Sequence, residues 1–433
     1  MVAQLLQMSN GLVDSIVAGQ LGAQELAAGG IGASLWFAAS LLCIGLMAGL
    51  SPTLSALIGQ RRTQEIGRVF RQGIWLAIFT GAIALTVLLT LRLMLHHFPF
   101  SGELSALMAE YMLGAAFSLP FVAAFMAARN LCEAVGATRV VLLVTAVGLC
   151  INCVASAGLG LGLFGLPQLG LFGIGLATSL VNVCMAVSLF LVLTRSTFTR
   201  FCLFTSFERP QWAQLKSLLV LSIPIFLGML FESGLFVATS LQMGMIGVIE
   251  SGAHQIAISA SGFCFMLPLG MSFALTARIA RAGAQGKVAT IYLRVISGAL
   301  LIVLIAGTTA LALALFRYQI AQVYTNDAEV IHLAVRLMLL GSVFQLSDSA
   351  QIVLIGILRG LHDTRIPMLI NAFSYWVIAF GLGILSAHWL GWGAYGLWVG
   401  LIIGLSIAAL LLGWRLRWML SSGSWYSKTD IAS

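Results

Sequence analysis

The chain has 433 residues, of which 60% are hydrophobic and only 8% are charged, and its formal net charge is +8. Soluble globular proteins average about 45–50% apolar and about 25% charged residues, so this composition excludes a soluble enzyme. A membrane helix needs ~20 apolar residues, and with its connections the chain has room for about twelve such helices.

Apolar segments recur along the whole chain and predict an all-α polytopic membrane protein with twelve transmembrane helices. In chain order the segments lie near 1–18, 27–58, 72–95, 105–128, 140–160, 170–194, 217–241, 250–277, 295–316, 329–357, 367–387 and 394–414. Most of the 22 Lys and Arg residues follow the even-numbered segments. The positive-inside rule therefore predicts that both termini are cytoplasmic, and it explains the basic charge without a nucleic-acid partner.

A weak internal repeat divides the chain into two halves that are offset by about 225 residues. Residues 137–140 align with 363–366, and residues 169–173 align with 392–396. Two six-helix lobes that cross the membrane in the same sense are typical of secondary transporters, and we expect a cavity between them. The predicted division is an N-terminal lobe over 1–195, a cytoplasmic linker over 196–216, a C-terminal lobe over 217–420 and a cytoplasmic tail over 421–433.

The same alignment predicts that the first helix is truncated. The seventh segment has a polar lead-in that contains Pro224, whose counterpart in the first half would precede Met1. We therefore expect about 15–25 residues of an ancestral first helix to be missing. The first segment that remains is short for a span.

Three acids, Asp14, Glu232 and Asp348, lie well inside apolar segments. Each costs about 2.5–3.5 kcal/mol at the centre of a bilayer, so a sequence without a functional demand would be expected to lose them. They are the candidate ion-coupling residues, and the alternative for each is a structural hydrogen bond to another helix. Carboxylates with hydroxyl and amide oxygens suit a hard monovalent cation, or they can share and release a proton. The residues alone do not choose between Na⁺ and H⁺.

Polar neighbours of these acids indicate a wet interior, because they recur at spacings of three and four residues on single helix faces. The first helix carries Gln4, Gln7, Gly11 and Asp14, with Asn10 beside them; the tenth carries Gln345, Asp348 and Gln351; the eighth carries Glu250, His254 and Gln255. His254 can titrate or donate a hydrogen bond, and a histidine at a helix packing surface is an equally good interpretation.

Catalytic motifs are missing from the sequence. It contains no HExxH helix, no GxxxxGK[ST] phosphate loop and no GxSxG nucleophile elbow. We therefore expect a protein that is not an enzyme, has no cofactor and uses an ion gradient in place of ATP.

Several stretches together resemble one family of transporters. They are residues 7–19, 45–52, 231–232, 253–255 and 356–360, with Asp348 and Gln351. On these residues the chain resembles the multidrug and toxic compound extrusion (MATE) transporters, specifically their bacterial NorM-like branch. The resemblance covers the whole length apart from the missing start.

The resemblance implies a V-shaped pair of six-helix lobes in the bacterial inner membrane that exchanges Na⁺ or H⁺ for amphipathic, often cationic, drugs. It implies that Glu232 and Asp348 hold the cation, Na⁺, in the second lobe and that Asp14 is the acid of the first lobe. Gln255 matches a polar position near that cation site. NorM-like members often carry a tyrosine four residues before the tenth-helix acid, whereas this chain has Phe344 there, so a hydroxyl ligand is lost.

Aromatic and methionine side chains can line a cavity that accepts flat cations by stacking, cation–π attraction and adaptable thioether contacts. The candidate cavity residues are Gln7, Asn10, Trp36, Phe37, Phe263 and Phe265. Our interpretation is a monomeric drug/Na⁺ antiporter. The alternatives are an H⁺-coupled antiporter of the same fold, a passive channel and a flippase for lipid-linked precursors. A flippase should carry cationic cavity residues, whereas the first and seventh apolar cores carry acids and no Lys or Arg.

Overall fold

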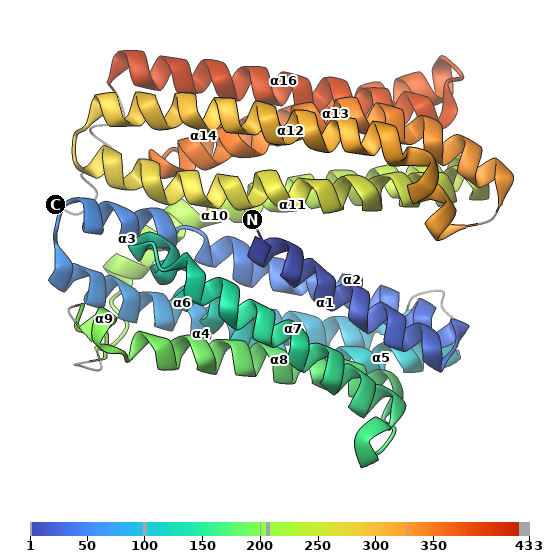
Figure 1. Ribbon diagram of the computed structural model, residues 1–433, viewed down its shortest axis with the longest axis horizontal. Coiled ribbons are helices and arrows are strands. Elements are labelled where there is room, and N and C mark those ends of the chain that lie inside the picture. Colours follow the sequence, from blue (N-terminus) through green and yellow to red (C-terminus); the bar gives the residue numbers. More distant parts are fainter. Residues whose placement is uncertain (1, 98–101, 200, 205–207, 326, 424–433) are drawn as a thin grey trace. The chain divides into compact units, whose positions relative to one another are not determined.

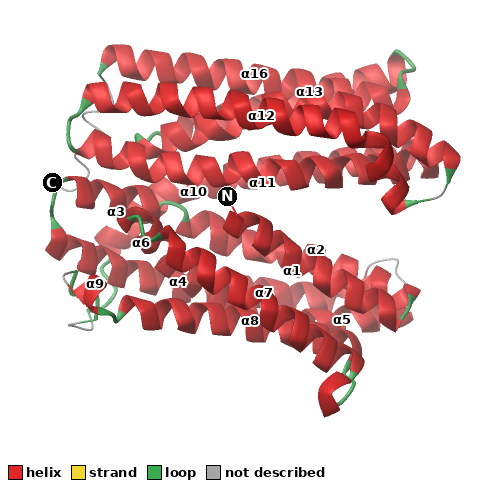
Figure 2. Ribbon diagram, viewed as in Figure 1, coloured by secondary structure: helices red, strands yellow, loops and turns green. Residues whose placement is uncertain are grey.

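A computed structural model describes residues 2–97, 102–199, 201–204, 208–325 and 327–423. Within these ranges every regular element is a helix and no strand occurs, as Figure 2 shows. The all-α prediction is therefore confirmed.

Two compact units make up the chain, the first over Val2–Phe226 and the second over Leu227–Ser433. The division falls inside the long helix α10 (Trp212–Ile246), two residues after Pro224. Proline has no amide hydrogen, so it removes one helical hydrogen bond at this point. The predicted lobe limits at 195, 216 and 420 rest on apolar runs and charge, and they stay a prediction.

The first unit contains the helices before α10 and the beginning of α10 (Figure 1). They are α1 (Val2–Leu21), α2 (Ala23–Met47), α3 (Leu50–Gly59), α4 (Thr63–Met94), η1 (Leu95–His97), α5 (Gly102–Ala116), α6 (Ser118–Val135), α7 (Thr138–Leu161), η2 (Leu163–Gly165), α8 (Gly170–Leu193) and α9 (Ser196–Thr199). The beginning of α10 belongs to the core of this unit, because Leu215 and Leu218 are buried in it. Gly45 and Gly49 allow α10 to pack closely against this unit. A Cβ on Gly45 would collide with Phe226, and a Cβ on Gly49 would collide with Ser222.

The second unit contains the rest of α10 and the helices that follow it. They are α11 (Val248–Ala284), α12 (Val288–Tyr324), α13 (Ala328–Gly360), α14 (Arg365–Ala372), the π-helix η3 (Phe373–Ala379), α15 (Phe380–Ile384), the π-helix η4 (Leu385–Trp389) and α16 (Gly393–Ser422). Helix α13 packs against α11, α12 and α16, and these helices lie side by side in Figure 1. The side chain of Asp327 caps α13 by accepting hydrogen bonds from the backbone amides of Glu329 and Val330.

Both units contain helices that are long and apolar enough to span a membrane. Among the described residues, 10 helical segments are long and apolar enough to cross a bilayer, and α5 with α6, which are bent by 41° relative to each other, make an eleventh if the pair is one span. Helix α1 has 20 residues but is not among the segments apolar enough to cross a bilayer. The 10 or 11 candidate spans of the described residues agree roughly with the predicted twelve helices, and the chain is a multi-pass membrane protein.

The internal repeat is visible in backbone turns. The turn after α3 closes with the amide of Arg62 donating to the carbonyl of Leu57, and the turn after α11 closes with Lys287 donating to Ala282. The residue before each donor is left-handed, with φ of 61° at Arg61 and 65° at Gly286. The two turns lie at the offset that the sequence repeat predicts.

Candidate functional site

Asp14 in the first unit is held by three hydrogen-bond donors. Ser156 Oγ donates to Asp14 Oδ1 over 2.7 Å, and Asn152 Nδ2 donates to the same oxygen over 3.1 Å. Thr178 Oγ1 donates to Asp14 Oδ2 over 3.1 Å. Asn152 and Ser156 lie four residues apart on one face of α7, and Thr178 comes from α8. The carboxylate therefore fastens α1 to two neighbouring helices.

A second polar cluster fixes the other end of the same α1 face. The buried Arg129 of α6 donates from Nη2 to Gln4 Oε1 over 2.8 Å and from Nη1 to Gln7 Oε1 over 3.0 Å. Its Nε donates to Glu133 Oε1 over 2.8 Å. Gln7, predicted as a cavity residue, is thus engaged by an arginine of its own unit.

The second unit places Asp348 at the end of a short hydrogen-bonded chain. Gln351 Nε2 donates to Asp348 Oδ1 over 3.3 Å, and Tyr375 Oη donates to Gln351 Oε1 over 2.5 Å. All three side chains are buried, and Tyr375 lies in the π-helix η3, a kind of helix that often occurs at functional sites. The phenol orients the glutamine amide so that its NH₂ group faces the carboxylate.

Glu232 and Arg359 complete the charges around Asp348. Glu232 of α10 is half-buried and interacts electrostatically with Asp348. Arg359 of α13 is 7% exposed and interacts electrostatically with Glu232. Two carboxylates and one guanidinium carry a formal charge of −1 when all are ionised.

Spare oxygen atoms surround this acid pair. Gln345 lies one helical turn before Asp348, and its Oε1 is buried and accepts no hydrogen bond from the described residues. Within the same part of the chain, Glu232 takes part in no hydrogen bond and Asp348 accepts a single one. These oxygens match the preference of hard cations for oxygen ligands.

Phe344 belongs to an aromatic cluster rather than to the acid pair. Its ring is 2% exposed and packs edge-on against Phe236 at 6.1 Å and Trp398 at 5.7 Å between ring centroids. The hydroxyl in the Asp348 network comes from Tyr375. The sequence did not predict Tyr375 and Arg359 as site residues. Two features could have indicated them: Tyr375 lies inside an apolar segment, and Arg359 lies in residues 356–360, which resemble the family.

Two predicted supporting residues lie in separate local contacts. His254 is 1% exposed, and its Nε2 lies 3.1 Å from Ser240 Oγ in a hydrogen bond. Gln255 is exposed and donates from Nε2 to Ser259 Oγ over 3.5 Å. Among the described contacts, neither side chain hydrogen-bonds to Glu232 or Asp348.

The predicted cavity residues divide into packed and exposed members. Trp36 Nε1 donates to Ser118 Oγ over 2.7 Å, and Phe265 packs against the apolar core of the second unit. Phe37 and Phe263 are 53% and 48% exposed. Asn10 keeps a buried Oδ1 that accepts no hydrogen bond from the described residues. Phe37 and Phe263 therefore have free ring surface in their own units, whereas Trp36 and Phe265 are occupied with packing.

Comparisons with known proteins agree along nearly the whole chain. The family model described as MatE matches residues 1–158 and 224–385. A probable multidrug resistance protein NorM from Xanthomonas campestris pv. campestris is 36% identical over 408 residues, which cover 94% of this chain and 89% of the relative. The multidrug resistance protein MdtK of Yersinia pseudotuberculosis is 33% identical over 431 residues, covering 96% and 93%. Among solved structures, the eukaryotic MATE transporter AtDTX14 has the same fold, with a TM-score of 0.90 at 17% identity over 99% of this chain and 94% of that chain.

Proposed function

The chain belongs to the MatE family, and from that premise we propose that it exports amphipathic, cationic drugs across the bacterial inner membrane in exchange for Na⁺. Membership confirms the resemblance read from the sequence and identifies a membrane transporter rather than an enzyme. The names of the NorM and MdtK relatives support drugs as the exported class. The observation that carries the proposal is the Glu232–Asp348 pair in the second unit.

The composition of this pair supports a single monovalent coupling ion. Glu232, Asp348 and Arg359 leave one net negative charge, which one Na⁺ or one H⁺ neutralises. Oxygens of Glu232, Asp348 and Gln345 remain open to a metal cation. We propose Na⁺ because a proton needs no such set of oxygens, whereas Na⁺ does.

Coupling follows from reciprocal linkage. If the ion at Glu232 and Asp348 favours the outward-facing state and weakens drug binding, the drug weakens ion binding by the same factor. Entry of Na⁺ down its gradient then drives the drug outward. Phe37 and Phe263 are the aromatic residues that we propose for contact with the drug, because their rings are exposed for stacking and cation–π contacts.

A transport assay in proteoliposomes tests the coupling ion. An imposed Na⁺ gradient should drive ethidium transport, and a pH gradient of the same size without Na⁺ should not. Transport driven by the pH gradient alone would establish the H⁺-coupled alternative. Failure of both gradients would refute the antiporter.

Substitution of the buried acid tests the site. Asp348→Asn keeps the volume of the side chain and removes the charge, so Na⁺-driven transport should fall at least about 100-fold while the protein stays folded in the membrane. Asp327→Asn on the same helix is the matched control, because asparagine caps helices as well as aspartate does and Asp327 is exposed. Normal Na⁺-driven transport by Asp348→Asn would overturn the site assignment.

A further inference from the structure

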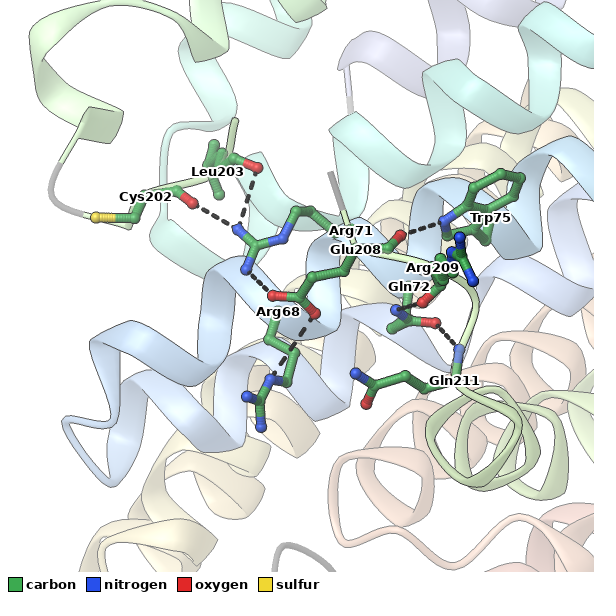
Figure 3. A network of polar contacts seen from close by, with 9 residues as sticks. All are labelled: Arg68, Arg71, Gln72, Trp75, Cys202, Leu203, Glu208, Arg209 and Gln211. Carbon is green, nitrogen blue, oxygen red and sulfur yellow. Dashed lines mark hydrogen bonds and ion pairs between the residues drawn. The ribbon is translucent and has the colours of Figure 1, made fainter. Parts of the chain in front are cut away.

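A tryptophan fastens neighbouring segments in each unit, but the two side chains do so in different ways. In the first unit, Trp75 Nε1 donates a hydrogen bond to the backbone carbonyl of Glu208 over 2.9 Å, as Figure 3 shows. Beside it the backbone amide of Gln211 donates to Gln72 Oε1 over 2.8 Å, so residues 208–211 are held on α4 by directed hydrogen bonds. In the second unit, Trp376 of η3 contacts α10 with the edge of its ring. The contact of Trp376 therefore depends on the size of the groups that meet.

The indole of Trp376 packs where α10 has a glycine. A Cβ placed on Gly234 would lie 3.0 Å from Trp376 Cζ2 and 3.7 Å from Trp376 Cη2. The first of these distances is shorter than a carbon–carbon contact of about 3.5–4.0 Å, so a side chain at 234 would push the indole and α10 apart. The Trp376 ring also packs against Phe380 at 5.8 Å between ring centroids, and Phe380 packs against the apolar core of the second unit. The indole is therefore a spacer between η3 and α10.

The opposite side of α10 faces the helix that carries Asp348. Residues two apart on a helix lie about 200° apart around its axis, so Glu232 and Phe236 are on the side opposite to Gly234. The Phe236 ring packs edge-on against Phe344 of α13 at 6.1 Å between ring centroids. Phe236 comes one helical turn after Glu232, and Phe344 comes one turn before Asp348. The two acids therefore lie one turn away from a direct contact between their helices.

The π-helix that carries Trp376 is held on two further sides. Tyr375, the preceding residue, donates from Oη to Gln351 Oε1 of α13 over 2.5 Å. Ala379, the last residue of η3, packs closely against α16, because a Cβ on Gly404 would collide with it. Single π-helical turns inside α-helices often occur at functional sites. Because η3 is fixed to α13 and α16, the size of the indole determines how far α10 lies from η3.

We propose that Trp376 is a positioning residue for the acid pair, because the volume of its indole sets the place of Glu232 relative to Asp348. The ring acts through Gly234 and the backbone of α10, and it needs no contact with the ion. A binding site works well when its ligands are held within about 0.5 Å of the productive geometry. The proposal rests on the acid pair being the ion site of the proposed function, and it adds a residue that controls the affinity of that site.

An exchange of volume between positions 234 and 376 tests the proposal in the proteoliposome assay. Gly234→Ala adds a methyl group against the indole, and Trp376→Phe removes the part of the ring that contacts position 234. Each change alone should lower the apparent affinity for the driving ion about threefold, because the site depends on close placement of its ligands. The double variant should recover most of the affinity, since the smaller ring leaves room for the methyl group. The maximal transport rate should change less than about twofold, because weaker ion binding raises the half-saturating concentration without slowing turnover.

Two matched variants separate this contact from general effects. Gly228→Ala lies on the same helix, where an added Cβ meets no atom within 4 Å among the described residues, and it should leave the ion affinity unchanged. Trp389→Phe, at an 83% exposed position of η4, should leave it unchanged as well. Thermal unfolding without the ion checks that each variant is folded. Losses that add in the double variant would overturn the proposal, and so would a Trp376→Phe variant with the ion affinity of the parent.

The same assay keeps the role of Trp376 apart from the identity of the coupling ion. The apparent affinity is measured for whichever ion drives transport by the parent, Na⁺ or H⁺. If only a pH gradient drives transport, the Na⁺ proposal fails, while the exchange of volume still tests Trp376. If neither gradient drives transport, the acid pair couples no ion and both proposals fail.

Discussion

Asp14 in the first unit and Asp348 in the second are both acids within apolar helices, yet their surroundings differ. The Asp14 carboxylate accepts hydrogen bonds from Ser156, Asn152 and Thr178. Asp348 accepts one from Gln351 at 3.3 Å and has Glu232 as a charged neighbour. The three donors favour the structural alternative for Asp14, whereas the open oxygens of Asp348 favour ion coupling, and both roles stay predictions. The number of hydrogen-bond donors around an intramembrane acid therefore tells more about the role of that acid than its position in an apolar helix does.

Arg359→Gln should produce the largest loss of stability. The change leaves Glu232 without its neighbouring cation, and removal of one partner from a buried set of charges costs about 3–5 kcal/mol in free energy of unfolding. Thermal unfolding in detergent measures it, and added Na⁺ should recover part of the loss. Arg365→Gln, at an exposed position on α14, is the control. A loss as small as that of the control would mean that Arg359 does not neutralise the pair.

Asp14→Asn and Asp348→Asn test the comparison directly. Asparagine offers Asp14's donors a single acceptor oxygen and an NH₂ group in place of the second oxygen, so the first variant should lose about 2 kcal/mol of stability. The second variant should lose less than about 1 kcal/mol, because it gives up one long hydrogen bond and relieves repulsion by Glu232. Equal losses in thermal unfolding would contradict the distinction between the two acids.

Tyr375→Phe should have a smaller effect that is specific to the second unit. Loss of the hydroxyl leaves Gln351 Oε1 without its donor, which costs about 1 kcal/mol and loosens the amide that faces Asp348. The apparent Na⁺ affinity in the transport assay should fall about fivefold, by the same free-energy scale. Tyr395→Phe, a half-buried tyrosine of α16, is the control. Unchanged Na⁺ affinity in Tyr375→Phe would remove this residue from the site.

Glu208→Gln measures how much a partly exposed ion pair contributes to the stability of the first unit. Glu208 is 21% exposed in its pair with Arg71, and such partly exposed pairs contribute about 0.5–1 kcal/mol. The loss in thermal unfolding should thus be the smallest of the series and should shrink at high salt. A loss as large as that of Asp14→Asn would place the linker contact among the principal stabilising interactions of the first unit.

Much of the fold could be predicted from the sequence, because membrane helices are apolar runs whose length is set by the bilayer. The acids could be found for the same reason, since a charge inside such a run stands out. The pairing of Asp348 with Gln351 was also accessible, because residues three apart share a helix face.

Partners on other helices could not be predicted. Asn152, Ser156 and Thr178 meet Asp14 from positions more than 130 residues away in the chain. Periodicity within one helix carries no information about which face of a distant helix it meets. The same reason applies to Tyr375, whose hydroxyl reaches Gln351 from η3. The sequence shows that Phe344 lacks a hydroxyl, but it does not show that Tyr375 brings one to Gln351 from another helix.

Helix α10 has a consequence for how this chain can be recombined with its relatives. Its beginning fills the first unit at Gly45 and Gly49, and its continuation carries Glu232 in the second unit. A chimera joined within the linker would take all of α10 from the relative. The first unit would then pack against the beginning of a helix that comes from another protein. A junction between Phe226 and Leu227, just after Pro224, would instead keep each half with its own packing partners. The duplicated halves are therefore exchangeable modules only when the crossover lies inside a helix.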